Sequence, residues 1–240
     1  MGRAFEVRKK SMMQTSASKS KLYARYGKEI YVAAKNGVPD PTMNQVLKQV
    51  IEKAKRDQIP ADVIKRAVEK AAGSGGENYQ SVRYEIFGPA SSLLIVDCLT
   101  DNPNRSISDL RAAFNKAEGK LGVSGSVMHF FEHLSVFSFK GLDEETVMES
   151  LLEKDCDFDD IETEEDIVTV YANPSSFNKI RQALSEIKTD LEMLAEEITF
   201  LPLDRIKITA ENEAKLFEKL LLLIEDCDDV QNIYHNVILD

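Results

Sequence analysis

The sequence predicts an α+β protein of more than one domain, and three observations predict this fold class. The N-terminal third contains three amphipathic helical patterns with short connections, which is typical of a three-helix bundle. Residues 83–105 contain two strand patterns separated by Gly88-Pro89. Residues 136–203 alternate in the order βαββαβ, which indicates a ferredoxin-like domain. A chain of 240 residues has room for these parts, at roughly 100 to 200 residues per domain.

The first two helices of the bundle are predicted from apolar spacing and from residues that begin or end helices. The first helix is expected from Lys19 to Asn36-Gly37, which would end it in the left-handed conformation. The second is expected to begin at Asp40-Pro41, with Met43 and Val46 on its apolar face.

The third helix follows Pro60, and Gly73-Ser74-Gly75-Gly76 after it predicts a flexible linker and a domain boundary. The charge balance also inverts here. Residues 1–76 hold 16 Lys and Arg against 7 Asp and Glu, whereas residues 77–240 hold 14 against 34. Such opposed charges argue for different partners, a polyanion for the basic end and solvent or protein for the acidic end.

A middle domain with the layers of an α/β sandwich is expected next. After the paired strands, Ser106 and Asp109 form a capping-box pattern that predicts a helix to Ala117. Gly119 to Ser126 predicts a turn that leads into an apolar strand at 127–131.

The C-terminal segment is expected to belong to this middle domain. Thr209 is expected to cap an apolar helix, and a strand pattern follows at 230–239. The helix is too apolar to face solvent alone, so it requires a sheet to cover. The predicted domains are therefore 1–76, a discontinuous middle domain of 77–132 plus 205–240, and the inserted ferredoxin-like domain of 133–204. Within the inserted domain, strands are expected at 136–139, 158–162, 168–172 and 191–201, and helices at 143–153 and 177–187.

Three ordered motifs resemble the central signatures of a known family. They are Tyr84-Glu85-Ile86-Phe87-Gly88-Pro89, Cys98-Leu99-Thr100-Asp101-Asn102 with Asn104-Arg105, and Gly119-Lys120-Leu121-Gly122 followed by Gly125-Ser126-Val127. They are similar to those of the YebC family of probable transcriptional regulators, which also contains a mitochondrial translational activator. The resemblance covers nearly the whole chain and implies a discontinuous three-domain architecture and a role with DNA in transcription. Family members commonly open with Gly-His-Ser-Lys-Trp, where this chain has Gly2-Arg3-Ala4-Phe5-Glu6.

The strongest functional signal in the residues themselves is a basic N-terminus. Eight positive residues among the first 28 are opposed only by Glu6, and such a field attracts phosphate backbone. Tyr23, Tyr26 and Tyr31 lie among them and are expected either to stack on bases or, as favoured for Tyr26, to pack in the bundle. Two arginines near the middle helix are expected either to add a phosphate contact or to pair with neighbouring carboxylates. The candidate nucleic-acid-binding residues are Arg3, Arg8, Lys9, Lys10, Lys19, Lys21, Arg25, Lys28, Arg105 and Arg111.

Other kinds of site are not predicted. The acidic run at 155–166 lacks the glycine and closing glutamate of a calcium loop. His129 and His133 are four residues apart, but a predicted strand rather than a helix holds His129, so the two side chains need not converge on a metal. No nucleophile with a matched histidine and no phosphate-binding loop is recognised, so no enzyme, cofactor or metal is expected. Three widely spaced cysteines predict buried thiols, and the absence of a signal peptide or an apolar span predicts a cytoplasmic protein without a membrane partner.

The predicted function is a nucleic-acid-binding regulator of gene expression, in the first instance a DNA-binding transcriptional regulator that contacts phosphate through its basic N-terminal domain. Two alternatives stay open. One is a ribosome-associated translation factor that binds ribosomal RNA, because phosphate contacts alone do not distinguish DNA from RNA. The other is an adaptor that binds a protein partner through the acidic ferredoxin-like domain.

Overall fold

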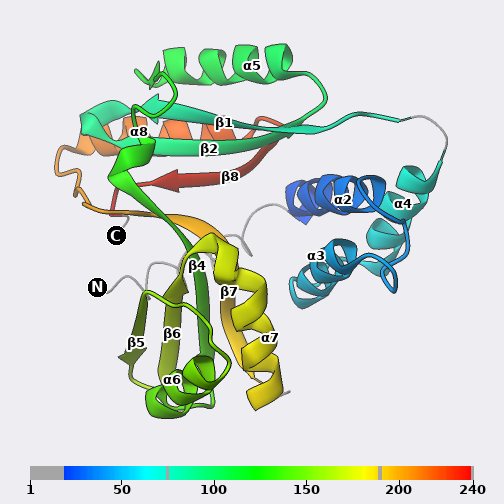
Figure 1. Ribbon diagram of the computed structural model, residues 1–240. Helices are drawn as coiled ribbons and strands as arrows, with labels where there is room; N and C mark the ends of the chain where they lie inside the picture. Colours follow the sequence, from blue (N-terminus) through cyan, green and yellow to red (C-terminus); the bar gives the residue numbers. More distant parts are fainter. Residues whose placement is uncertain (1–18, 74–75, 189–190, 239–240) are drawn as a thin grey trace. The chain divides into compact units, whose positions relative to one another are not determined.

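The computed structural model describes residues 19–73, 76–188 and 191–238 of the chain. These residues form helices and two separate four-stranded sheets, which confirms the predicted α+β multidomain class (Figure 1). The described chain divides into two compact units. We call residues 130–203 the inserted unit and the described residues of 19–129 and 204–238 the main unit. The predicted domain limits at residues 76, 132 and 204 stay a prediction.

The main unit begins with the predicted three-helix bundle, made of α2 (Lys19–Lys35), α3 (Gln45–Arg56) and α4 (Ala61–Ala72). Each helix carries apolar residues on one face, and these side chains meet in one core. Ile30 of α2 and Leu47 of α3 are fully buried there. The bundle is thus held by its own apolar core.

The end of α2 was predicted correctly, but the predicted device was wrong. The helix ends at Lys35, yet neither Asn36 nor Gly37 adopts the left-handed conformation. Instead, the Nδ2 atom of Asn44 donates to the carbonyl of Ala33 at 2.9 Å. A Cβ on Gly37 would lie 2.6 Å from this Nδ2 atom. Gly37 therefore allows Asn44 to approach and satisfy a carbonyl at the helix end.

The beginning of α3 was predicted too early. Asp40 accepts hydrogen bonds from the backbone N–H and hydroxyl of Thr42, at 2.8 and 2.7 Å, and so forms a turn. The side chain of Asn44 caps α3 instead. Met43 and Val46, expected on the apolar face, are 73% and 60% exposed.

The rest of the main unit is a sheet in the order β3-β1-β2-β8. As predicted, β1 (Gln80–Phe87) and β2 (Leu93–Thr100) pair antiparallel, and β2 leads into α5 (Pro103–Lys116). The short strand β3 (Lys120–Leu121) pairs with β1 at one edge.

The C-terminal segment completes this sheet, as predicted. Strand β8 (Val230–His235) pairs with β2 at the other edge. Helix α8 (Glu211–Glu225) begins two residues after Thr209, and no side chain caps it. Both α5 and α8 pack on the same face of the sheet, because one core cluster contains residues from the strands and from both helices: Ile86, Leu94, Val96, Leu110, Phe114, Phe217, Leu220 and Ile224.

Helix α5 does not use the predicted capping box. It begins at Pro103 with Asn102 as its cap, because the Asn102 side chain accepts from the Arg105 N–H at 3.2 Å. Ser106 lies inside the first turn, and its hydroxyl donates to Asp229 Oδ2 at 2.7 Å. The Ser106 hydroxyl, which local spacing had assigned to the helix cap, therefore binds Asp229, a residue far away in the sequence.

The strand predicted at 127–131 is wrong for residues 127–130, because a strand begins only at Phe131, and Glu85 explains why. Its buried carboxylate accepts from the backbone N–H groups of Gly125, Val127 and Met128 at 2.5, 2.6 and 2.9 Å. These donors are therefore not available to a strand ladder, and a 3₁₀ helix at Met128–Phe130 follows. Burial opposes ionisation of Glu85, but the three donors outweigh it and lower its pKa.

Replacing Glu85 by Gln is expected to destabilise the main unit by about 1.5–3 kcal/mol at neutral pH, because hydrogen bonds to a charged acceptor are lost. Since the folded pKa of Glu85 is lowered, its contribution is present above the unfolded pKa of about 4.3 and is lost as pH falls towards the folded value. Urea unfolding of both proteins from pH 7 to pH 3 measures this. A gap that stays constant over that range would contradict the assigned role, and the exposed Glu118→Gln is the control.

The inserted unit has the predicted ferredoxin-like order. Its sheet runs β5-β6-β4-β7, with every neighbouring pair antiparallel. Helices α6 and α7 pack on one face of it around Phe137, Phe139, Val168 and Val170. The elements are β4 (Phe131–Lys140), α6 (Glu144–Glu153), β5 (Asp160–Glu164), β6 (Ile167–Ala172), α7 (Phe177–Ile187) and β7 (Glu192–Pro202).

Candidate nucleic-acid interface

The predicted cations of α2 face an acidic turn of the main unit, the one that joins α8 to β8. Lys21 forms an ion pair with Asp226. Lys28 lies closer to the sheet, and its Nζ atom is 2.8 Å both from Asp229 Oδ1 and from the carbonyl oxygen of Asp228. These two lysines therefore already have anionic partners, and phosphate would have to compete with them.

Arg25 lies on the same helix and is half-buried. Burial lowers the pKa of its guanidinium, while the carboxylates of Glu225 and Glu29 act in the opposite direction. An arginine stays charged even so, because its ordinary pKa is above about 12. Carboxylates of the main unit thus compensate the positive charge of Arg25, as they do for Lys21 and Lys28.

Asp229 is the centre of this contact. Its carboxylate is 4% exposed and accepts from the hydroxyls of Thr100 and Ser106 at 2.9 and 2.7 Å. It also accepts from Arg105 Nη2 at 2.9 Å and from Lys28. Burial disfavours the charged carboxylate, but these four donors outweigh it and hold the pKa of Asp229 far below its ordinary value. Asp229 therefore joins α2 of the bundle to strand β2 and to helix α5, which packs on the sheet.

The other predicted residues have different surroundings. Arg105 pairs with Asp101 at 2.8 Å as well as with Asp229, which is the carboxylate pairing that we weighed against a phosphate contact. Lys19 and Arg111 are exposed, at the start of α2 and on α5. The remaining four candidates lie outside the described residues: Arg3, Arg8, Lys9 and Lys10.

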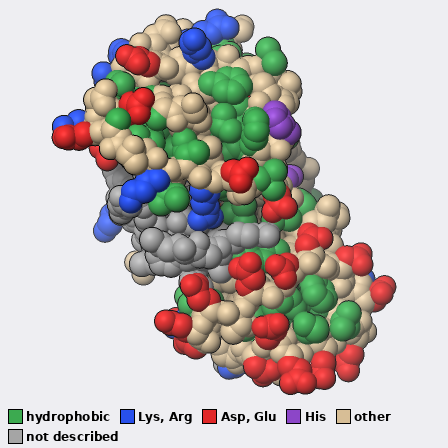
Figure 2. Space-filling model, turned by 90° about the vertical axis from the view of Figure 1, so that its left-hand side faces the viewer, with side chains coloured by type: hydrophobic (Ala, Val, Ile, Leu, Met, Phe, Trp, Pro, Cys, Tyr) green, Lys and Arg blue, Asp and Glu red, His purple; other side chains and the backbone are tan. Residues whose placement is uncertain are grey.

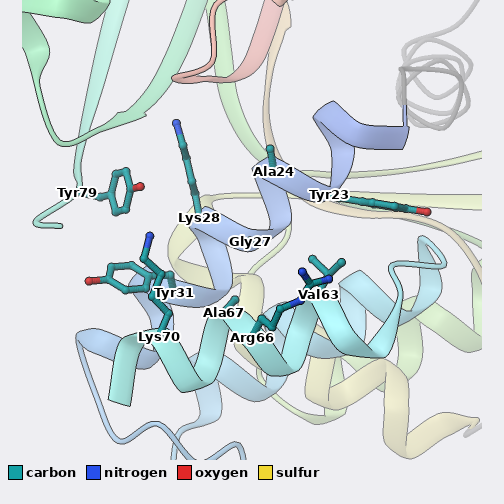
Figure 3. Close-up of a pocket in the computed structure, with 10 residues that line it drawn as sticks. All are labelled: Tyr23, Ala24, Gly27, Lys28, Tyr31, Val63, Arg66, Ala67, Lys70 and Tyr79. Carbon is teal, nitrogen blue, oxygen red and sulfur yellow. The ribbon is translucent and has the colours of Figure 1, made fainter. Parts of the chain in front are cut away.

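A groove lies beside this contact, between α2 and α4 of the bundle (Figure 3). It is a cavity of about 390 Å³. Aromatic and cationic side chains stand around small residues in its lining. They are Tyr23, Tyr31 and Tyr79, the cations Lys28, Arg66 and Lys70, and Ala24, Gly27, Val63 and Ala67. Proteins bind single-stranded nucleic acids through such side chains, because bases stack on tyrosine rings and cations attract the phosphates.

The three tyrosines singled out in the sequence differ in their exposure. Tyr26 is buried in the bundle and donates a hydrogen bond to Asp57. Burial raises the pKa of its phenol, and the hydrogen bond to Asp57 raises it further. Tyr31 is only 3% exposed, and its hydroxyl donates to the carbonyl of Glu77 at 3.1 Å. Tyr23 is half-buried and lines the groove. Packing therefore accounts for Tyr26, whereas the half-buried Tyr23 and the more deeply buried Tyr31 both line the groove.

Sequence reasoning missed three residues of the groove. Arg66 and Lys70 are four apart on α4, so they share one face of that helix, and this spacing was a usable signal. Tyr79 follows the glycine linker, and nothing in its local sequence indicates that it returns to α2. Its ring lies 5.6 Å from that of Tyr31 in an edge-to-face arrangement.

No cluster of His, Cys, Asp or Glu among the described residues could hold a metal ion. The ring of His133 stacks on that of Phe200, with the ring centres 4.3 Å apart. The thiols of Cys98, Cys156 and Cys227 are free, and Cys227 is only partly buried. No described helix combines the length and apolar character needed to cross a membrane.

The inserted unit is strongly acidic. Residues 130–203 contain 19 Asp and Glu against 5 Lys and Arg. Acidic side chains gather on its surface in the lower part of Figure 2. Such a surface repels phosphate, so the inserted unit does not contribute to the candidate interface.

Comparison with known proteins decides the family. Residues 3–74 match the model of the TACO1/YebC protein N-terminal domain, and residues 79–237 match that of the TACO1/YebC second and third domain. The chain belongs to the TACO1/YebC family. This confirms the resemblance recognised in the three central motifs.

TACO1/YebC relatives match the chain along its whole length. A probable transcriptional regulatory protein of Pseudoalteromonas translucida is 52% identical over 239 residues, which cover 100% of this chain and 99% of the relative. Another probable transcriptional regulatory protein, from Acholeplasma laidlawii, is 52% identical over 238 residues, which cover 99% of this chain and 98% of that relative. The crystal structure of the conserved hypothetical protein Aq1575 from Aquifex aeolicus superposes with a TM-score of 0.75 at 30% identity, covering 94% of this chain and 93% of that one.

Proposed function

We propose that this protein is a nucleic-acid-binding regulator of gene expression that contacts the phosphate backbone through its basic N-terminal domain. The segregation of charge carries the proposal. The first 76 residues hold 16 Lys and Arg against 7 Asp and Glu, while the inserted unit alone holds 19 acidic residues. A basic region on an otherwise acidic chain concentrates attraction for a polyanion at one end. Relatives named probable transcriptional regulatory proteins support the regulatory role.

The phosphate contacts that we propose first are Lys19, which is exposed, and the basic residues Arg3, Arg8, Lys9 and Lys10 that precede it in the sequence. Lys21, Arg25 and Lys28 already face carboxylates. No catalytic step and no cofactor form part of the proposed function, and the cytoplasm is its proposed location. DNA is the target that the names of the relatives favour.

A translation factor that binds ribosomal RNA is the second candidate. The groove between α2 and α4 favours it, because tyrosines beside cations suit unpaired bases, which RNA loops present and duplex DNA does not. Purified protein should therefore be tested on duplex DNA, on scrambled duplex of equal length and on ribosomal RNA. A preference for one proposed operator of a thousandfold or more would favour a sequence-specific transcription factor.

Replacing Arg8, Lys9, Lys10 and Lys19 by Gln is expected to weaken binding to duplex DNA and to flatten its dependence on salt. Each phosphate contact contributes roughly 0.9 to the slope of log affinity against log salt, so the slope should fall by about 3 to 4. Fluorescence anisotropy from about 50 to 200 mM salt measures this slope.

The matched control removes the same charge from the inserted unit, by replacing Lys140, Lys154, Lys179 and Lys188 with Gln. This control should leave the slope unchanged, because it lowers the net charge by the same amount but removes no proposed phosphate contact. Equal effects of the two variants would mean that net charge and not the N-terminal segment drives binding. A wild-type protein that binds neither DNA nor RNA would refute the proposed function and favour the protein-binding adaptor.

A further inference from the structure

The groove between α2 and α4 is open because its floor is made of small residues. Ala24 and Gly27 of α2 and Ala67 of α4 line it there (Figure 3). A Cβ added at Gly27 would meet no atom within 4 Å. Glycine weakens the interior of a helix, so its place in the middle of a 17-residue helix carries a cost that no left-handed conformation explains. The missing side chain keeps the groove open.

One wall of the groove is an ordered aromatic pair. The rings of Tyr31 and Tyr79 meet edge to face with their centres 5.6 Å apart. Glu77 fixes both, because its carbonyl accepts from the Tyr31 hydroxyl at 3.1 Å and its carboxylate accepts from the Tyr79 hydroxyl at 2.9 Å. The contact with Tyr31 and the hydrogen bond to Glu77 thus hold Tyr79, whose ring is less buried than that of Tyr31, in a fixed orientation.

Each ring of this aromatic wall has a cation close to it. Lys28 Nζ lies 5.6 Å from the centre of the Tyr79 ring, and Lys70 Nζ lies 5.5 Å from that of Tyr31. Lys70 and Arg66 each pair with one carboxylate, but their side chains are well exposed, and lysine and arginine have three and five donors. Donors are therefore left over for an anion at the rim.

We propose that this groove holds one unpaired base of a single-stranded nucleic acid, with the adjoining phosphates at Arg66 and Lys70. A cavity of about 390 Å³ lies in the range of small-molecule sites, and its apolar floor, tyrosine wall and cationic rim correspond to the apolar face, the stacking face and the phosphates of a nucleotide. A base in a duplex is paired and stacked and does not enter such a groove. The inference rests on the proposed nucleic-acid function and adds to it a preference for unpaired strands.

Gly27→Leu tests the groove directly, because the new side chain fills the floor without displacing an atom at its Cβ. Leucine also favours the helix, so the melting temperature should be equal to or higher than that of the wild type. Ala72→Leu is the matched control, since it adds apolar bulk at an exposed position of α4 that does not line the groove. The probes are a labelled mixed-sequence strand of about 12 nucleotides, as RNA and as DNA, an abasic strand of the same length and the corresponding duplex.

The wild type is expected to bind the strand with bases about tenfold more tightly than the abasic strand, which is the scale of one stacked base. Gly27→Leu should abolish that preference while leaving affinity for the abasic strand and the duplex unchanged, and Ala72→Leu should retain it. A Gly27→Leu protein that keeps the full preference overturns the inference. So does a wild type that binds both strands equally, in which case the proposed phosphate-binding function still stands. A wild type that binds none of the probes removes the proposed function as well.

Discussion

Replacing Leu220 by Ala is expected to destabilise the main unit by about 3–5 kcal/mol, the range for fully buried leucines. Leu220 lies on the inner face of α8 and is completely buried in the core that α5 and α8 share with the sheet. Its Cδ2 and Cδ1 atoms approach Gly88 and Gly119, at 3.1 and 3.6 Å from where a Cβ would stand on each. Glycine backbone has no side chain that could move into the space left by leucine, so most of the cavity should persist.

Urea unfolding followed by far-ultraviolet circular dichroism measures the effect. The control is Leu222→Ala on the same helix, because Leu222 is 63% exposed and its loss should change the free energy of unfolding by about 0.5 kcal/mol or less. Similar effects at both positions would show that α8 does not cover the middle sheet through Leu220. The comparison also tests the inserted arrangement, since Leu220 follows the inserted unit in the sequence but packs against strands that precede it.

The elements that could be predicted from sequence are those whose apolar residues repeat at a fixed spacing. One buried face explains each such pattern: the alternation at Tyr84 and Ile86, the apolar run from Leu93 to Val96, and the helical spacing in the bundle. The order of elements in the inserted unit then fixed its topology, because few arrangements connect such a series without crossings. The unpaired C-terminal helix and strand required a sheet, and only the middle segment lacked cover.

Two of the errors occurred where a side chain distant in the sequence takes a local hydrogen-bonding group. Glu85 binds three backbone N–H groups about 40 residues away and prevents the strand expected at 127–131. Asp229 binds Ser106, so a pattern that resembles a capping box belongs to the interior of α5. Local spacing carries no information about such partners.

The candidate site shows the same limit. A high density of lysine and arginine indicated a basic surface, but Lys28 and its partner Asp229 are 201 residues apart in the sequence. Charge counting therefore pointed to α2 as a candidate binding surface without showing that Lys21 and Lys28 were already paired. The groove was missed for a related reason, because Tyr79 joins it from beyond the glycine linker.

Replacing Asp229 by Asn is expected to destabilise the main unit by about 3 kcal/mol at neutral pH. Removing one member of a buried ion pair costs about 3–5 kcal/mol, because the other charge is left without compensation. The side chain of Lys28 is only 17% exposed and has little access to water, whereas that of Arg105 is 47% exposed and can be solvated. The lower end of the range is therefore expected. Asp226→Asn is the control, since its pair with Lys21 is exposed and should contribute less than about 1 kcal/mol.

The dependence on pH distinguishes loss of this charge from a loss of packing. Because the folded pKa of Asp229 is lowered, its stabilising contribution is complete above the unfolded pKa of about 3.9 and is lost as pH falls towards the folded value. The difference between wild type and Asp229→Asn should therefore shrink in acid, and a constant difference down to pH 2 would indicate a packing defect. Nucleic-acid binding gives an independent measurement. Lys28 released from Asp229 becomes available to phosphate, so the salt slope of the variant should rise by up to about 0.9 if α2 forms part of the binding surface. An unchanged slope would mean that Lys28 only joins the bundle to the sheet.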